Sequence, residues 1–428
     1  MALKALLRRA SAILLGMTAV ASAQAAEPTA DFSARAGELV ALFNGTTRPK
    51  TMFTPAFLTD VPEDRLAAIA KQMTAQLGVA RAVDRIDVKS PNMGVVMLAF
   101  ARGTATIDLV IEAAAPHRIE GLLITGSEVT NDSFATILEE LAGLPADTSL
   151  SVARLSDGAP GPIATHHAER PMAIGSSFKL FVLAELVRAI GAGERRWDDA
   201  APLTHRSLPS GFLQAWPRGS PLTLHTLAAL MISQSDNSAA DTLLHLLGRE
   251  NVEALLPALG VRAAERNRPF LSTLEAFALK AGEEAPRQAW IEGDEGKRRA
   301  LLSSLAEIDP ADIDIARFAG DPLAIDSAEW FASTDDLVRT MDWLRRHGDE
   351  RALALLAINP GIGGAAAEAF DYLGYKGGSE AGVVNMTVLL RNEAGGWYAV
   401  SGSWNDPVAR LAEARFAMLM SRAVALLR

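Results

Sequence analysis

A serine and a lysine three residues apart, Ser176 and Lys179, could carry out acyl transfer together. The segment from Phe178 to Ile190 is apolar on almost all sides, which predicts a buried helix with Ser176 at its amino end. Backbone donors and the helix dipole favour developing negative charge at that end. Lys179 follows one turn later on the same face, where burial disfavours its charged form and lets it accept the serine proton. This spacing also arises by chance in many chains, so it needs support from other segments.

A second polar segment, Ser235-Asp236-Asn237, lies between two stretches with helical patterning, 224–232 and 238–247. A hydroxyl and an amide side by side in a loop are polar groups that acyl transfer could use. The alternative is an ordinary helix cap, because Ser238 and Asp241 have the spacing of a capping box. Both interpretations can hold for one segment.

A third segment, Lys376-Gly377-Gly378, lies in a stretch that predicts a strand. The backbone of such a strand can pair with an acyl-amide substrate. Lys376 would supply positive charge for a substrate carboxylate and would lower the barrier to proton transfer. The three segments therefore each cover a different need of acyl transfer, with a nucleophile and a base in the first and an electrostatic partner in the third.

These segments must be positioned by one sheet. Strands are predicted at both ends of the second half of the chain, at 150–155, 162–167, 383–390 and 397–403, and nearly everything between them has helical period. A carboxyl-terminal helix is expected from Val408 to Leu427. The fold class is therefore α/β (α+β), with one antiparallel sheet and helices on both faces.

A smaller α+β domain is expected before it, over residues 26–126. It combines helical patterning at 34–43 and 62–77 with alternating strands at 94–100, 105–112 and 119–124. Helices followed by a curved meander resemble the cone-shaped nuclear-transport-factor-2-like (NTF2-like, or steroid-isomerase-like) domains. Asp84, Asp87 and His117 are interpreted as solvated residues, so no chemistry is assigned to this domain.

The stretch from Thr130 to Arg428 resembles the class A β-lactamase and penicillin-binding-protein superfamily, on the three segments described above. The resemblance implies an acyl-enzyme on the serine of the first segment. It also implies that the other segments act as proton relay, substrate clamp and electrostatic partner, and that two backbone N–H groups form an oxyanion hole. The implied catalytic residues are Ser176, Lys179, Ser235 and Lys376, and the implied substrate-binding residues are Asn237, Gly377, Gly378 and Ser379, with the N–H groups of Ser176 and Ser379 as the oxyanion hole.

Two departures from the family pattern bear on activity. Gly377 stands where the family has threonine or serine, and neighbouring Ser379 replaces that hydroxyl only in part, which puts carboxylate-bearing substrates in doubt. Class A enzymes also carry a glutamate with an asparagine four residues later for deacylation. Here Glu275 is followed by Leu279 at that spacing, and a surface carboxylate is the alternative interpretation of Glu275.

The distance from Ser235 to Lys376 is longer than is usual in the family, and the extra length is assigned to Glu283–Asp321, which we expect to extend the rim of the cleft. The domain pairing, this lengthened middle and the Lys-Gly-Gly segment resemble two-domain β-lactamase-like proteins that include a member from clavulanic acid biosynthesis. That group is linked to esterase-type activity.

The amino end predicts export. Residues 1–25 have a basic start, a short apolar run and small residues suited to cleavage, which is typical of a signal peptide, so a periplasmic or secreted protein is expected. Loss of Lys4, Arg8 and Arg9 would take the formal net charge of −10 down by three, which opposes nucleic acid as a partner. We expect no membrane span after the signal peptide. The chain has no cysteine, and its histidines lack ligand spacing, so we expect no cofactor and no metal, His166 and His167 being strand residues.

The sequence therefore predicts a signal peptide (1–25), an NTF2-like domain (26–126) and a β-lactamase-like serine hydrolase domain (130–428). The expected substrate is a small molecule, namely a β-lactam, an ester or an acyl-peptide. Two alternatives stay open: an esterase or D-alanyl-D-alanine-type peptidase, and a penicillin-binding sensor that acylates without efficient turnover.

Overall fold

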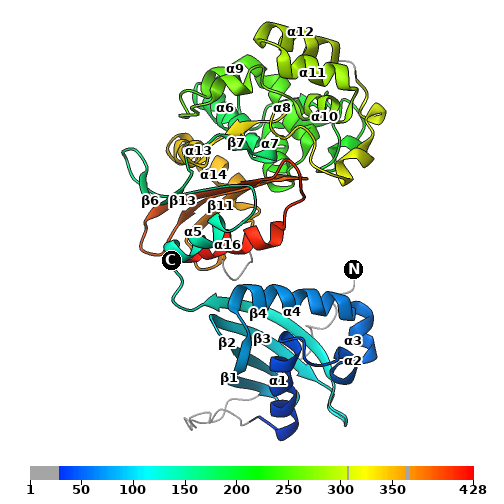
Figure 1. Ribbon diagram of the computed structural model, residues 1–428. Helices are drawn as coiled ribbons and strands as arrows, with labels where there is room; N and C mark the ends of the chain where they lie inside the picture. The colour runs from blue at the N-terminus through cyan, green and yellow to red at the C-terminus, as the bar shows by residue number, and fades with distance from the viewer. Residues whose placement is uncertain (1–27, 306–307, 363–366) are drawn as a thin grey trace, which may run out of the picture. The chain divides into compact units, whose positions relative to one another are not determined.

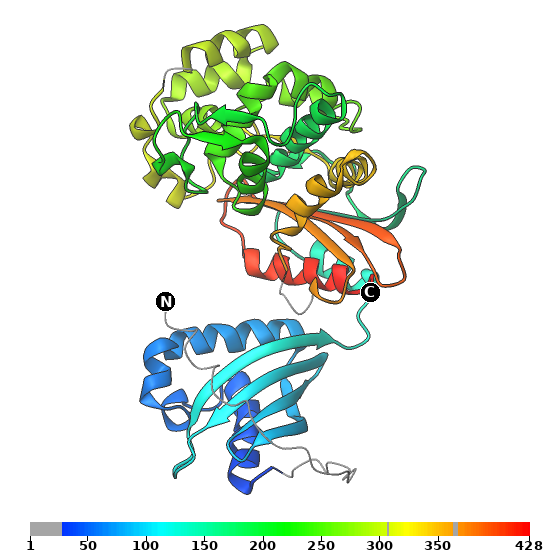
Figure 2. The same cartoon turned by 180° about the vertical axis from the view of Figure 1, so that it is seen from behind.

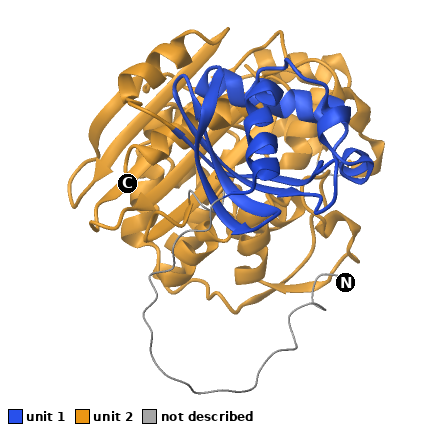
Figure 3. Ribbon diagram, turned by 90° about the horizontal axis from the view of Figure 1, so that it is seen from below, with its two compact units in different colours: residues 1–128 blue, residues 129–428 orange. Residues whose placement is uncertain are grey.

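The computed structural model describes residues 28–305, 308–362 and 367–428. The predicted signal peptide lies outside the described residues. The chain divides into two compact units, residues 1–128 and 129–428 (Figure 3). Each unit is described here by itself.

Unit 1 is a four-stranded antiparallel sheet in the order β1-β2-β3-β4 with helices packed on it (Figure 1). Helix α1 packs against strands β1 to β3, and α4 packs against α1. Strand β1 was not expected from the sequence, because most of its side chains are exposed and it lacks the alternation seen in β2 and β3. The elements are α1 (Ala30–Phe43), α2 (Pro49–Met52), α3 (Pro55–Asp60), α4 (Glu63–Leu77), β1 (Ala80–Ser90), β2 (Met93–Phe100), β3 (Gly103–Ile111) and β4 (Ile119–Val129).

Unit 2 is built on a five-stranded antiparallel sheet that joins both ends of its sequence, in the order β11-β12-β13-β5-β6. This confirms the predicted α/β class with an antiparallel sheet. The register pairs Val400 with Val152 and Ala399 with Ala153, so successive residues face opposite sides of the sheet. The strands are β5 (Asp147–Leu155), β6 (Gly161–His166), β11 (Tyr372–Glu380), β12 (Val383–Arg391) and β13 (Trp397–Asn405).

Helices cover both faces of this sheet (Figures 1 and 2). One face, with Val152 and Val400, packs against α5 and α16. The other face, with Ala153 and Ala399, packs against α13 and shares a large core with the helices that follow Ser176. The helices are α5 (Phe134–Ala142), α6 (Lys179–Gly191), α7 (Leu224–Ser233), α8 (Asn237–Leu247), α9 (Arg249–Leu255), α10 (Thr273–Ala281), α11 (Glu284–Glu292), α12 (Glu295–Leu305), α13 (Thr334–His347), α14 (Glu350–Ala357) and α16 (Glu413–Ala425).

Short elements complete unit 2. Two two-stranded ribbons form, β7 with β10 and β8 with β9. The 3₁₀ turn η1 precedes α6 and packs against β11 and β12, which brings the Ser176 segment to the edge strand of the sheet. The bounds are β7 (Met172–Ala173), β8 (Ala200–Pro202), β9 (Pro221–Thr223), β10 (Phe331–Ala332), η1 (Gly175–Phe178), η2 (Leu213–Ala215), η3 (Ala264–Asn267), η4 (Pro310–Asp312) and η5 (Ile315–Ala319).

The carboxyl-terminal helix begins later than expected. Val408 was predicted as its start, but α16 begins at Glu413. The Asp406 side chain accepts hydrogen bonds from the backbone nitrogens of Val408 and Ala409, and this turn holds the chain out of the helix.

Candidate active site

The serine of the first segment lies in a tight turn rather than in the helix itself. Ser176 is in η1, and α6 begins at Lys179. Gly175, which precedes the serine, has a φ of 49°, a left-handed conformation that favours glycine. The nucleophile candidate is therefore placed just before a buried helix, one residue after a strained position that glycine tolerates.

Lys179 is the centre of the site. Its residue exposure is 0%. Its Nζ lies 3.0 Å from Ser176 Oγ, 3.0 Å from Ser235 Oγ, 2.7 Å from the Ser235 carbonyl oxygen and 2.6 Å from Asn237 Oδ1. The structure thus brings Ser176 of the first segment and both Ser235 and Asn237 of the second segment around one amine.

These four contacts fit a neutral amine. The Ser235 carbonyl and Asn237 Oδ1 only accept hydrogen bonds, so they take the two N–H groups of a neutral amine. The lone pair is then left for a hydroxyl proton from Ser176 or Ser235. Burial, followed by the positive charge of Lys376, lowers the pKa of Lys179 well below its ordinary value. Lys179 can therefore act as a base toward Ser176.

Ser235 joins the two lysines of the site. Its Oγ lies 3.0 Å from Lys179 Nζ and 3.1 Å from Lys376 Nζ. Ser235 has a φ of 53°, and Ser210 Oγ donates to its carbonyl oxygen at 2.6 Å. A hydroxyl held between two amines can pass a proton from one to the other.

Lys376 also donates to the carbonyl oxygen of Gly377. The lysine has an exposure of 3%, and burial lowers its pKa to about 7. Near neutral pH it therefore exists in both charge states, unlike an exposed lysine.

The helix cap after Ser235 differs from the predicted one. Asp236, not Ser238, is the N-cap of α8, and its side chain accepts from the Ala239 nitrogen. Ser238 Oγ instead accepts from the Ser207 nitrogen, and Asp241 is buried beside Thr273. The loop is therefore fixed by Asp236, which leaves Ser235 free to face the lysines.

Asn237 contributes to the site in a way that the sequence did not indicate. Its Oδ1 accepts from Lys179, and its Nδ2 donates to the Leu208 carbonyl oxygen at 3.0 Å. The side chain is buried, and it does not line the cavity that contains Ser176. The Asn237 side chain contacts Lys179. The predicted contact of Asn237 with the substrate remains a prediction.

Strand β11 approaches the serine turn through glycine. A Cβ built on Gly378 would lie 2.4 Å from the Ser176 nitrogen, and one built on Gly175 would lie 3.3 Å from the Ser379 nitrogen. The backbone nitrogens of Ser176 and Ser379 therefore lie at the same corner, as two oxyanion donors must. No larger residue fits at Gly378 without moving this backbone.

A cavity of about 630 Å³ opens beside these groups. Its lining includes Ser176, Ser235, Lys376 and the Gly377–Ser379 backbone, together with Tyr375, Asn359 and Glu413. Among its lining residues in the described chain, Glu413 is the one carboxylate. The segment Glu283–Asp321 was expected to extend the rim of the cleft. None of its described residues lines this cavity.

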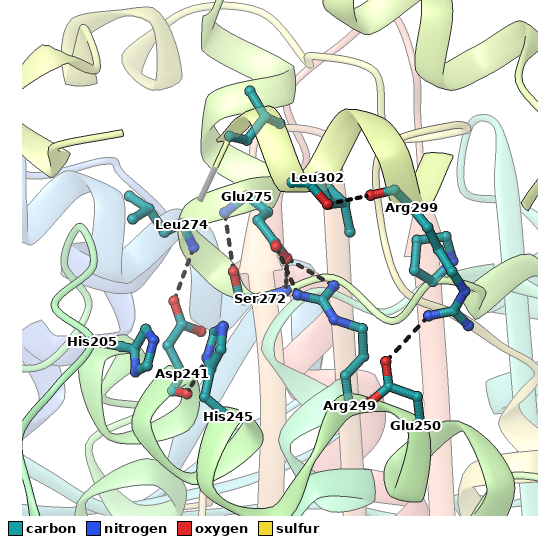
Figure 4. A pocket seen from close by; sticks show the side chains of 13 residues that line it. His205, Asp241, His245, Arg249, Glu250, Ser272, Leu274, Glu275, Arg299 and Leu302 are labelled. Carbon is teal, nitrogen blue, oxygen red and sulfur yellow. Dashed lines mark hydrogen bonds and ion pairs between the residues drawn. The ribbon is translucent and has the colours of Figure 1, made fainter. Parts of the chain in front are cut away.

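Glu275 has a structural role. It is buried, and it is the third residue of a capping box that starts α10. Its carboxylate pairs with Arg249 at 2.7 Å and borders a different cavity, of about 380 Å³ (Figure 4). The surface-carboxylate interpretation is therefore wrong, and the carboxylate is already committed to Arg249.

No group of three or more histidine, aspartate or glutamate residues suited to a metal ion occurs within residues 28–305, 308–362 and 367–428. The helices described in these ranges are too short or too polar to traverse a bilayer.

Known proteins were compared with this chain by family and by structure. Residues 133–300 match the model of the Beta-lactamase enzyme family, and this stretch contains Ser176, Lys179 and Ser235. A search of curated proteins found no match.

Solved structures similar to this chain include a β-lactamase from Sphaerobacter thermophilus, at 22% identity and a TM-score of 0.47, covering 68% of this chain and 94% of that one. A variant of PBP-A, solved as an acyl-enzyme complex with penicillin G, is 14% identical with a TM-score of 0.47, covering 69% and 95%. A β-lactamase from Chitinophaga pinensis is 15% identical with a TM-score of 0.46, covering 69% and 98%.

Proposed function

We propose that this protein is an exported serine acyl-hydrolase of the β-lactamase type, related to class A, which forms an acyl-enzyme on Ser176. Its substrate is a β-lactam or a related amide or ester. The observation that carries the proposal is the contact of the buried Lys179 amine with Ser176 Oγ, at 3.0 Å, in a setting that favours the neutral amine. A match of residues 133–300 to the Beta-lactamase enzyme family supports it.

In the acylation step, Ser176 Oγ attacks the carbonyl carbon of the substrate while its proton moves to the Lys179 amine. The carbonyl π electrons move to oxygen, and the backbone N–H groups of Ser176 and Ser379 would donate to that oxyanion. The close approach of Gly378 to the Ser176 nitrogen supports this role. Lys179 becomes an ammonium whose charge balances the negative intermediate.

In the second half of the step, the bond from carbon to the leaving nitrogen or oxygen breaks. The Ser235 hydroxyl donates its proton to the leaving atom and regains one from Lys179 or Lys376, both within 3.1 Å. Water then attacks the acyl-ester on Ser176 and releases the acid. The serine recovers its proton in that step, so atoms and charges balance over the cycle.

A second candidate is a penicillin-binding sensor that acylates and turns over slowly. It is favoured by the lining of the Ser176 cavity, where Glu413 is the one carboxylate among the described residues, and by the commitment of Glu275 to Arg249. An activated water for deacylation normally needs a base close to the ester. An esterase or a D-alanyl-D-alanine-type peptidase would use the same acylation step.

The remaining assignments are also proposals. We infer export to the periplasm or the medium from the amino-terminal pattern, and an NTF2-like character for unit 1 from its helices and meander. A small molecule is the proposed partner.

Intact-mass measurement tests the acyl-enzyme directly. We expect a penam to add its own mass to the wild-type protein and not to a Ser176→Ala variant. A chromogenic cephalosporin, a short-chain ester and an acyl-D-alanyl-D-alanine peptide then separate the alternatives: multiple turnovers identify an enzyme and its substrate class, and one stoichiometric burst identifies a sensor. An unmodified Ser176 after exposure to all of these compounds would refute the proposal.

A further inference from the structure

A tyrosine fills the space that the side chain of residue 377 would take. Tyr375 lies two residues before Gly377 on β11, so both face the same side of the strand. A Cβ built on Gly377 would lie 2.0 Å from the Tyr375 hydroxyl oxygen. The glycine is therefore required by the tyrosine, whose hydroxyl occupies that place.

A second glycine makes room for the ring itself. A Cβ built on Gly361, which has a φ of 68°, would lie 2.4 Å from Cγ and Cδ1 of Tyr375. Gly361 and Gly377 come from separate segments, and each would collide with the tyrosine if it carried a side chain. The ring is thus held in one position, with its hydroxyl over the Gly377 backbone.

The hydroxyl of Tyr375 is available to a ligand. It forms no hydrogen bond with any described residue, although the side chain is half-buried, and buried phenol groups usually have a partner. Tyr375 lines the same cavity as Ser176, Ser235 and Lys376. Burial, with the carboxylate of Glu413, raises the pKa of Tyr375 to about 12, so the hydroxyl keeps its proton and can donate it.

We propose that Tyr375 is a substrate-binding residue, and that its hydroxyl donates a hydrogen bond to an acceptor oxygen of the substrate beyond the scissile carbonyl. This inference rests on the proposed acyl transfer at Ser176. It identifies the substrate class as amides or esters that carry such a second oxygen beside the Gly377 backbone, where the Tyr375 hydroxyl lies. The edge strand thus supplies a hydroxyl from residue 375 where residue 377 has no side chain.

The test compares acylation of Ser176 in wild-type protein and a Tyr375→Phe variant, followed by intact mass. Benzylpenicillin carries a carboxylate as its second acceptor, and phenyl acetate carries none. We expect the substitution to slow acylation by benzylpenicillin about tenfold, the size of one lost hydrogen bond to a charged group, and to leave phenyl acetate unchanged. Tyr372→Phe is the matched control, because the Tyr372 hydroxyl donates to the Leu353 carbonyl and lies outside the cavity lining.

A swap of the hydroxyl between the two positions sharpens the test. Gly377→Ser alone should impair acylation, since its side chain collides with Tyr375. In the Tyr375→Ala background the same serine should recover part of the rate that Tyr375→Ala loses, because it returns a hydroxyl to the same place.

The outcomes are distinct. Equal benzylpenicillin rates in wild type and Tyr375→Phe would overturn the role of Tyr375 and leave the acyl-enzyme intact. An equal loss with phenyl acetate would also overturn it, since the effect would then be structural. Absence of any adduct on Ser176 in the wild-type protein would overturn the proposed function and the role of Tyr375 with it.

Discussion

Unit 2 buries lysines at two places, with opposite results. Lys179 and Lys280 have exposures of 0% and 1%. Lys179 contacts hydroxyl, carbonyl and amide oxygens. Lys280 contacts two carboxylates, Glu329 at 2.5 Å and Glu380. The two sites share the desolvation of an amine and differ in the charge of the atoms around it.

The partners decide which protonation state is stable. Burial and Lys376 lower the pKa of Lys179, whereas the carboxylates of Glu329 and Glu380 outweigh burial and raise the pKa of Lys280. The first site therefore disfavours the ammonium form of Lys179, so its amine can accept a proton more readily than that of an exposed lysine. The second holds a fixed ammonium that ties α10 to the end of β11. One residue type serves reactivity in one place and stability in the other.

The largest expected effect comes from removing the reactive amine. Lys179→Met should slow acylation of Ser176 by about 10³-fold, since a positioned general base contributes about 10² to 10⁴. The free energy of unfolding should not fall and should rise at pH 7, because Lys179→Met removes the cost of taking a proton from a buried lysine on folding. Stopped-flow acylation and denaturant titration measure the two quantities. A large loss of stability would show that Lys179 resembles Lys280.

The opposite pattern is expected at the second site. Lys280→Met leaves Glu329 and Glu380 without their cation, and burial raises the pKa of Glu380 to about 8, so Glu329 is the charge left unpaired near neutral pH. The free energy of unfolding should fall by about 3 kcal/mol, at the low end of the range for breaking a buried ion pair. A Lys280→Met/Glu329→Gln double variant should recover part of this loss. Chemical denaturation measures both. If Lys280→Met unfolds at the wild-type denaturant concentration, the ion cluster is not structural.

The reactive site can be converted into the charged type. Asn237→Asp places a carboxylate where Oδ1 now accepts from Lys179 at 2.6 Å. An opposite charge at this range raises a lysine pKa by about 1 to 3 units, so the neutral fraction at pH 7 should fall and acylation should slow by about 10²-fold. The rate should recover as the pH rises. Asn237→Leu, which removes the amide without adding charge, is the control. A rate for Asn237→Asp that does not depend on pH would contradict the electrostatic explanation.

The candidate site residues that belong to local motifs were predicted from the sequence. Ser176, Lys179, Ser235 and Lys376 each belong to a short segment, and strands from both ends of unit 2 implied the sheet that brings them together. Residue spacing along a helix or strand is a local property, so it can be read without a structure.

The rest depended on tertiary contacts. Glu329 and Glu380 lie 49 and 100 residues from Lys280, and no spacing rule joins them. Asn237 was assigned to substrate, but whether its side chain faces the cavity or Lys179 is decided by packing. The position of Tyr375 could have been predicted from the sequence, because a residue two positions before Gly377 on a strand faces the same side as Gly377.

The smallest expected effect is the pH dependence set by Lys376. Its pKa of about 7 means that the ammonium loses its proton above neutral pH, so the rate of acylation should fall by up to tenfold per pH unit above 7 if the charged form assists. The stability of the fold should instead increase with pH. Between pH 7 and the ordinary lysine value of 10.5, the unfolded chain binds more protons than the folded one, so the free energy of unfolding rises with pH, by up to about 1.4 kcal/mol per unit.

Variants at this position separate the two effects. Lys376→Met should remove the share of this rise that Lys376 contributes, so stability should rise less between pH 7 and pH 9 in the variant than in the wild type, as denaturation curves at the two pH values measure. Lys376→Arg keeps its charge throughout, so any activity it retains should lack the fall above pH 7. For Lys280 the contribution to the free energy of unfolding should change with pH in the opposite direction. Its raised pKa stabilises the folded state below pH 10.5, and this stabilisation is lost only above that pH. If the wild-type rate stays flat from pH 7 to pH 9, Lys376 assists acylation without its charge. Lys179 and Lys376 would then both act as neutral amines, in contrast to the charged Lys280.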